Sequence, residues 1–272
     1  NLILAGNTVT VWNRSPEKAA KFARQSGCAV VDTPAQLVAS SAVVITMLSD
    51  DGASHQVHLG PDGLFAGKGA QTLIEMGTMS PDHIKALVGA APKGVQVLDA
   101  PVSGATQAAQ EATLMIMAGC SAQESAAIAP LFDAMGREVI YLGRSGAGVI
   151  MKLAVNSLIH GINQTLAEAM TLAEAAGIAP AQAFDVIEAS AACAPMLKYR
   201  RPLYLDEANN DVTFTVALAR KDLEVTAALA RVYGTAMPQG TVTLQKLMDA
   251  EAAGYGTRDM AAMLAFMKEE NP

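Results

Sequence analysis

The fold is decided by the stretch GRSGAGVIMKLAVN, residues 143–156, where a glycine-rich loop opens a long apolar helix. Lys152 and Asn156 are four positions apart, which places them on the same face of that helix. His160 and Asn163 continue this polar stripe, while most other residues of the helix are apolar. A helix that is apolar nearly all round is normally buried, and burying an unpartnered ammonium group is costly. We therefore expect Lys152 to have either a structural partner or a chemical role.

The composition indicates a globular protein of one or two domains. The chain has 272 residues, of which 51% are hydrophobic and 17% are charged, and this is enough for a sizeable core. The formal net charge of -7 argues against a nucleic-acid partner. The sequence has no apolar run of the ~18 residues that a membrane span needs, so we expect no membrane partner.

The cysteines and histidines show neither a disulfide pattern nor a metal-ligand pattern. The three cysteines lie far apart without a CxxC motif, and no signal peptide is evident, which together predict a cytoplasmic protein. His55 and His58 have no third ligand nearby in the sequence. We expect these two histidines to face solvent, and we expect no metal site.

Residues 1–145 alternate short β-branched runs with helical stretches. Strands are expected at residues 8–12, 29–31, 42–47, 72–76, 95–100, 113–118 and 138–142. Helices are expected at residues 16–25, 34–39, 81–91 and 122–135, and the first three begin with a proline after a Ser or Thr cap. This alternation predicts an α/β domain, a doubly wound and mostly parallel sheet of the Rossmann type.

The expected first strand and Gly-rich GxGxxG turn of that fold are missing from this sequence. Seven residues precede Thr8, which is too few for a strand, the turn and a helix. We interpret residues 1–6 as the end of that helix, closed by a glycine cap, and expect the sequence to begin after the turn. The alternative is a rearranged protein without a working pyrophosphate site.

Residues 146–272 contain no convincing strand and predict a separate all-helical domain. The helices are expected at residues 149–176, 180–189, 216–233, 238–253 and 258–268. The first of them is the long helix that carries Lys152. The sequence therefore predicts two domains, residues 1–145 and residues 146–272.

Asn13 and Arg14 follow the strand predicted at residues 8–12. In a dinucleotide-binding fold an acidic residue at this place selects NAD, whereas a nearby arginine accommodates the 2′-phosphate of NADP. No acidic residue is present in this turn, so Asn13 and Arg14 favour NADP, with NAD as the second possibility. The alternative interpretation of Arg14 is an ordinary solvated side chain at a helix start.

Three further segments carry groups suited to binding. Ser103 and Gly104 follow a predicted strand and can direct a hydroxyl and N–H groups at a carboxylate, or form an ordinary turn. Lys221 and Asp222 lie early in a predicted helix, where they complete a polar pocket or form a solvated pair. Thr78 either contacts the nicotinamide or caps the helix that follows it.

These motifs occur together, in order, in a family of known enzymes. The segments in question are Val11–Arg14, Asp99–Gly104, Gly146–Asn156 and Lys221–Leu223. By them the chain resembles the β-hydroxyacid dehydrogenases, the family of 3-hydroxyisobutyrate dehydrogenase, tartronate semialdehyde reductase and glyoxylate/succinic semialdehyde reductase. The resemblance implies an NAD(P)-dependent oxidoreductase with a Rossmann domain, an all-helical domain, and a small carboxylate-bearing substrate.

The resemblance also implies roles for individual residues. The lysine that matches Lys152 is the general acid/base, and the asparagine that matches Asn156 helps to place the substrate. The pair that matches Ser103 and Gly104 holds the substrate carboxylate. The lysine and aspartate that match Lys221 and Asp222 line the cleft, and this lysine also lies near the nicotinamide. The remaining cofactor contacts implied by the family are those of Met47, Leu48 and Thr78.

Departures from the family pattern leave alternatives open. Ala105 stands where many members have glycine, and Gln107, Ala108 and Ala109 replace a commoner ending of the same loop. An imine reductase shares this architecture, but Lys152 counts against it because that enzyme class usually has another residue there. A non-catalytic nucleotide-binding or scaffold protein is the second alternative. The long apolar helix predicts a homodimer or homotetramer.

Overall fold

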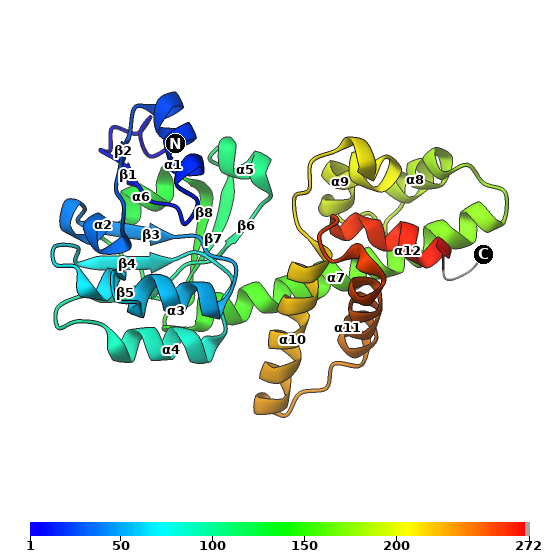
Figure 1. Ribbon diagram of the computed structural model, residues 1–272. Coiled ribbons are helices and arrows are strands. Elements are labelled where there is room, and N and C mark those ends of the chain that lie inside the picture. The colour runs from blue at the N-terminus through cyan, green and yellow to red at the C-terminus, as the bar shows by residue number, and fades with distance from the viewer. Residues whose placement is uncertain (270–272) are drawn as a thin grey trace. The chain divides into compact units, whose positions relative to one another are not determined.

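A computed structural model of the chain describes residues 1–269 (Figure 1). They form two compact units, which divide the chain between Lys152 and Leu153. The long helix α7 (Ala147–Ala175) contributes its first turns to the first unit and the rest to the second. Over residues 1–269 we find no helix that combines the length and the apolar character needed to cross a membrane.

The first unit contains three small sheets, and most of their strand pairs are parallel. The strands β3, β4 and β5 form the central sheet in that order, and both pairs are parallel. Among the others, the pair β1–β2 and the pair β7–β8 are parallel, whereas β6 runs antiparallel to β7. The strand bounds are β1 Thr10–Val11, β2 Ala29–Val30, β3 Val43–Thr46, β4 Thr72–Glu75, β5 Gln96–Asp99, β6 Val102–Ser103, β7 Leu114–Ala118 and β8 Gly136–Tyr141.

Six helices connect the strands of the first unit within the described residues, and the predicted α/β Rossmann-type architecture is confirmed. Their bounds are α1 Pro16–Ser26, α2 Pro34–Ser40, α3 Asp51–Leu59, α4 Pro81–Ala90, α5 Thr106–Gln110 and α6 Ala129–Asp133. Helices α3 and α4 lie side by side (Figure 1). The predicted proline starts of α1, α2 and α4 are confirmed, and Thr33 and Ser80 accept the expected capping hydrogen bonds. The hydroxyl of Ser15 makes no such bond.

Two predictions for the first unit are wrong, and helix α3 was missed. The helix expected at residues 122–135 shortens to α6, because the residues before Ala129 form turns. Helix α3 was not predicted, since its inward-facing residues are Ser54 and His58 rather than an apolar stripe. As a result His58 is fully buried, contrary to the solvent exposure expected for it, while His55 is exposed.

The second unit is all-helical, as predicted. Its helices, in addition to α7, are α8 Pro180–Ala189, α9 Pro195–Leu205, α10 Val216–Tyr233, α11 Pro238–Ala250 and α12 Met263–Glu269. The bounds of α8 and α10 agree with the sequence prediction, whereas α9 was not predicted. Helices α10 and α11 run side by side (Figure 1), and the core of the unit is apolar, with Phe184, Val216 and Leu223 among its buried residues.

The polar residues of α7 are buried with part of its apolar surface, while other apolar residues of the helix are exposed. Asn156, His160 and Asn163 are each only 3% exposed, so the polar stripe faces the interior. Leu158 and Leu172, by contrast, are 68% and 72% exposed. The helix therefore presents an uncovered apolar side within the single chain.

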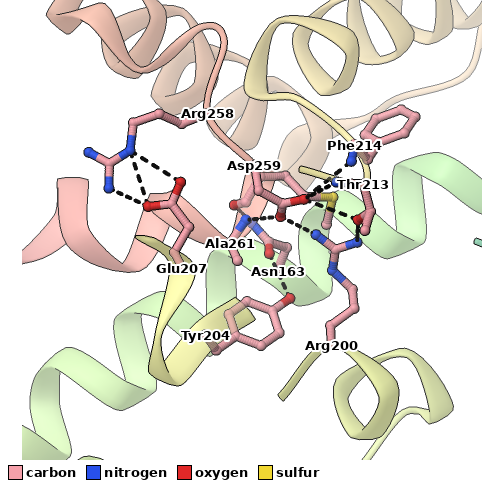
Figure 2. A network of polar contacts seen from close by, with 10 residues as sticks. Asn163, Arg200, Tyr204, Glu207, Thr213, Phe214, Arg258, Asp259 and Ala261 are labelled. Atoms are coloured by element: carbon pink, nitrogen blue, oxygen red, sulfur yellow. Dashed lines mark hydrogen bonds and ion pairs between the residues drawn. The ribbon is translucent and has the colours of Figure 1, made fainter. Parts of the chain in front are cut away.

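A buried ion pair lies at the centre of a polar network in the second unit (Figure 2). The carboxylate of Asp259, which is fully buried, pairs with the guanidinium of Arg200. The same carboxylate accepts hydrogen bonds from the backbone N–H groups of Thr213, Phe214 and Ala261, at 2.9, 3.2 and 2.9 Å. Satisfying a buried carboxylate in this way offsets the cost of removing it from water, so we assign this network a structural role.

Asn163 is also used structurally. Its side-chain amide donates to the carbonyl of Met260 at 2.9 Å, and its oxygen accepts from the hydroxyl of Tyr204 at 2.7 Å (Figure 2). Burial raises the pKa of that tyrosine hydroxyl. This part of the polar stripe on α7 thus anchors the segment before α12.

Candidate active site

Each of the three central strands of the first unit has a buried polar side chain at its last residue. Thr46, Glu75 and Asp99 are register partners across β3, β4 and β5, and they are 7%, 0% and 0% exposed. Register partners in a sheet point to the same face. The carboxyl ends of parallel strands are where open α/β sheets bind ligands, so this edge is where a cofactor site is expected.

The loops that leave β3 and β4 at this edge contain three predicted cofactor residues. Met47 is 62% exposed, while Leu48 and Thr78 are partly exposed. A Cβ atom on Gly77 would lie 2.5 Å from the carbonyl oxygen of Leu48, so only glycine allows the two loops to approach this closely. The structure therefore brings the segments of Met47, Leu48 and Thr78 close together.

Glu75 holds a network at the base of these loops that sequence reasoning missed. Its carboxylate accepts from the hydroxyl of Ser54 at 2.8 Å and from the backbone N–H of Gly77 at 3.0 Å. Burial raises the pKa of Glu75 to about 7, and hydrogen bonds from Ser54, Gly77 and Thr46 oppose that rise. The only signal in the sequence is a carboxylate at the end of a predicted apolar strand.

Asp99 fixes the start of α7, a role that its place in the sequence motif did not reveal. The Asp99 carboxylate accepts from the backbone N–H groups of Gly146 at 2.8 Å and Val149 at 3.0 Å. A Cβ atom on Gly148 would lie 2.8 Å from this carboxylate, which explains the glycine at this position of the quoted loop. Burial raises the pKa of Asp99, and the N–H donors of the α7 start oppose the rise.

Lys152 follows this anchored turn on α7 and is partly exposed. The turn is also packed, because Val149 lies in a small apolar cluster with Met79, Ile84 and Leu48. One cluster therefore joins the start of the lysine's helix to both cofactor-side loops. Lys152 consequently projects from a backbone that is fixed by hydrogen bonds and by packing.

The second unit holds the other predicted polar residues as a cluster. The amide of Asn156 donates to Asp222 at 2.5 Å, and the ammonium of Lys221 lies 2.9 Å from the other carboxylate oxygen. Asp222 is 1% exposed, and the side chain of Lys221 is 20% exposed. Asp222 thus orients its two neighbours by direct contacts.

The remaining predicted residues lie on accessible turns of the first unit. The side chain of Asn13 accepts from the N–H of Ser15 at 2.9 Å, and Arg14 beside it is exposed. Gly104 has a φ of +129°, a conformation that glycine adopts readily. A Cβ atom there would lie 2.7 Å from that of Ala108. Ser103 is partly exposed and Gly104 exposed, so both are within reach of a ligand.

Comparison with known proteins identifies the family of the chain. Residues 1–143 match the family model described as the NAD binding domain of 6-phosphogluconate dehydrogenase. Residues 146–267 match the model described as NAD-binding of NADP-dependent 3-hydroxyisobutyrate dehydrogenase. The chain belongs to the β-hydroxyacid dehydrogenase family.

Relatives named as dehydrogenases or reductases align with nearly the whole length of this chain. Glyoxylate/succinic semialdehyde reductase 1 of Arabidopsis thaliana is 28% identical over 98% of this chain and 93% of its own. 2-(Hydroxymethyl)glutarate dehydrogenase of Eubacterium barkeri is 29% identical over 97% of this chain and 88% of its own. A structure of Mycobacterium tuberculosis 3-hydroxyisobutyrate dehydrogenase with L-serine has a TM-score of 0.81 at 29% identity, covering 98% of this chain and 93% of that one. The protein is an NAD(P)-dependent oxidoreductase of hydroxyacids.

The first unit of this dehydrogenase fits a nicotinamide cofactor. Its parallel strands end in loops that expose Met47 and partly expose Thr78, and Arg14 is exposed in the turn after β1. Within residues 1–269 no group of three or more His, Cys, Asp or Glu side chains is arranged to hold a metal ion.

Proposed function

We propose that the protein is an NADP-dependent dehydrogenase of a small β-hydroxyacid, or reductase of the matching aldehyde-acid, with Lys152 as general acid/base. The observation that carries this proposal is the anchored start of α7, where Asp99 accepts two N–H groups of the first turn. Precise placement of a proton donor is what acid–base catalysis needs. When bound, the nicotinamide cofactor supplies the hydride chemistry.

Lys152 would move the proton that accompanies the hydride. In the reductive direction its ammonium group donates a proton to the carbonyl oxygen of the substrate. In the oxidative direction its neutral amine accepts the hydroxyl proton. General acid–base catalysis of this kind contributes about 10²–10⁴-fold to the rate.

We propose that the substrate-binding residues are Ser103, Gly104, Asn156, Lys221 and Asp222. We propose that Ser103 and Gly104 bind the substrate carboxylate, since both are accessible at the end of β6. Asn156 would place the reacting oxygen, with Asp222 fixing the amide of Asn156 at 2.5 Å. Lys221, fixed by the same carboxylate, would contact the substrate and the nicotinamide.

Replacement of Lys152 tests its proposed role. Lys152→Ala should lower kcat by about a hundredfold or more without unfolding the protein, measured by NADPH absorbance with glyoxylate, succinic semialdehyde, tartronate semialdehyde and 3-hydroxyisobutyrate. Lys198→Ala, which removes an exposed lysine from α9, is the matched control and should retain full turnover. Near wild-type turnover in Lys152→Ala would disprove the assignment.

Arg14 is proposed to select NADP, together with Asn13, and Met47, Leu48 and Thr78 to contact the rest of the cofactor. Support comes from the exposed guanidinium and from the match to a model of an NADP-dependent enzyme. Arg14→Ala should weaken NADPH binding by about tenfold or more, the typical cost of losing a charged hydrogen bond, and leave NADH binding nearly unchanged. Arg24→Ala on α1, also exposed, is the control; equal affinity of the wild type for NADPH and NADH would reject the preference.

We further propose that residues 1–145 serve the cofactor, and that residues 146–272 serve the substrate and self-association as a homodimer or homotetramer. The uncovered apolar residues Leu158 and Leu172 support the self-association. The three cysteines are free thiols, which supports action in a reducing compartment such as the cytoplasm.

A further inference from the structure

Glu75 is a fully buried carboxylate between the two loops assigned to the cofactor. It is the last residue of β4 and the register partner of Thr46, the last residue of β3. Met47 and Leu48 follow Thr46, and Gly77 and Thr78 follow Glu75 two and three positions later. A single side chain thus lies at the point where both loops leave the sheet.

The hydrogen bonds around Glu75 all run toward its carboxylate. Gly77 N–H donates to one oxygen and the Ser54 hydroxyl to the other. Burial lowers the pKa of His58, so its ring is neutral, and Nδ1 lies 2.9 Å from the carbonyl oxygen of Ser54. With Nδ1 protonated, His58 donates to that carbonyl within α3, and the Ser54 hydroxyl joins α3 to Glu75.

The hydrogen bond to the Gly77 N–H constrains a loop that is tightly packed against its neighbours. The backbone of Gly77 lies so close to the carbonyl of Leu48 that a Cβ atom would be 2.5 Å from it, and 2.6 Å from the methyl group of Met79. A shift of Gly77 therefore moves Thr78 and presses on Leu48 at once. The carboxylate of Glu75 is what holds the Gly77 N–H in this arrangement.

We propose that Glu75 is a positioning residue for the cofactor, which sets the geometry of Thr78 and Leu48 through its bond to the N–H of Gly77. The inference rests on the proposed function, because it takes Met47, Leu48 and Thr78 as cofactor contacts. An apolar side chain would fill this buried position at lower cost than a carboxylate. The carboxylate is explained if an acceptor for Gly77 is needed there.

The test compares an apolar and an amide replacement of similar size. Glu75→Leu removes both acceptors and should raise the Kd for NADPH by about tenfold. Glu75→Gln keeps a carbonyl oxygen for Gly77 and should bind NADPH within about threefold of the wild type. The Kd is measured by fluorescence titration of NADPH, and the KM for NADPH should rise in Glu75→Leu more than kcat falls.

Glu138→Leu is the control, since it makes the same exchange at an exposed position of β8. Thermal melts of every variant show which ones are folded at the temperature of the titration. If Glu75→Leu does not fold, Ser54→Ala takes its place, because it removes one donor to the carboxylate, and an increased Kd is again expected. Unchanged NADPH affinity in folded Glu75→Leu, or equal loss in Glu75→Leu and Glu75→Gln, overturns the inference.

A parallel titration of Thr78→Ala separates this inference from the proposed function. Weakened binding in Thr78→Ala with normal binding in Glu75→Leu overturns only the role of Glu75. Normal binding in Thr78→Ala with weakened, amide-rescued binding in Glu75→Leu overturns the assignment of Thr78 and supports Glu75 as the anchor of the loop.

Discussion

At the scale of single residues, Glu75 links the stability of the protein to pH. Its pKa is 4.5 in the ordinary state and about 7 in the folded protein. Between these values the folded state holds more protons than the unfolded state, so the free energy of unfolding falls as pH rises, and it stays low above about pH 7. The total loss is about 3 kcal/mol at most.

The side chain in Glu75→Gln stays neutral, so this variant should lack the fall in unfolding free energy that Glu75 causes as pH rises. Urea unfolding at about pH 5 and about pH 8 should show the variant gaining stability relative to the wild type at the higher pH. The titratable groups around Glu75, namely Asp51, His58 and His83, are present in both proteins and cancel in the comparison. A stability difference that is the same at both pH values would show that Glu75 does not titrate in this range.

The sequence indicated candidate residues for the site, which stay predictions, but it did not reveal the buried residues that support the loops around them. Lys152 and Asn156 were found from helix periodicity, and Arg14 from its position after a strand. Glu75 and Ser54 were missed because they act through tertiary contacts between β4 and α3, for which no spacing in the sequence is diagnostic. Their polar character at buried positions becomes meaningful only when burial is known.

At the scale of elements, the start of α7 depends on two glycines that face Asp99. A Cβ atom on Gly119 would lie 2.0 Å from a carboxylate oxygen of Asp99, so Gly119→Ala must displace the anchor of α7. We expect a loss of about 1–3 kcal/mol in unfolding free energy and a lower kcat, because Lys152 follows this anchor.

Gly89→Ala is the matched control for this substitution. Gly89 lies in α4, and a Cβ atom there would have nothing within 4 Å, so alanine should stabilise the protein by roughly 0.4–1 kcal/mol. Chemical denaturation and steady-state kinetics measure both effects. If Gly119→Ala keeps wild-type stability and kcat, the anchoring of α7 by Asp99 is not needed for the site.

Elements with clear boundary signals were predicted well, and those defined by tertiary packing were not. Helix α8 begins at a proline and α10 at a capping threonine, and both were predicted to the residue. Helix α3 begins at the N-cap Asp50, but the side chains it buries are polar, so its apolar periodicity is too weak to detect. The same weakness concealed the burial of His58.

At the scale of the whole molecule, the uncovered side of α7 predicts self-association. Leu158 and Leu172 are two of its exposed apolar residues, 68% and 72% exposed in the single chain. Exposed apolar surface of this kind commonly marks a protein interface. We expect the wild-type protein to be a dimer or tetramer, and the double substitution Leu158→Glu/Leu172→Glu to shift it toward the monomer, because carboxylates are costly to bury without partners.

Size-exclusion chromatography with light scattering gives the mass that checks this expectation. Val88→Glu is the control, since Val88 is an exposed apolar residue on α4 of the first unit, and this variant should keep the wild-type mass. Circular dichroism should show the same helix content in all three proteins, so that a lower mass reports a lost interface rather than unfolding. A wild-type protein that is monomeric at every concentration, or a double variant that keeps the wild-type mass, would show that this side of α7 does not mediate the assembly.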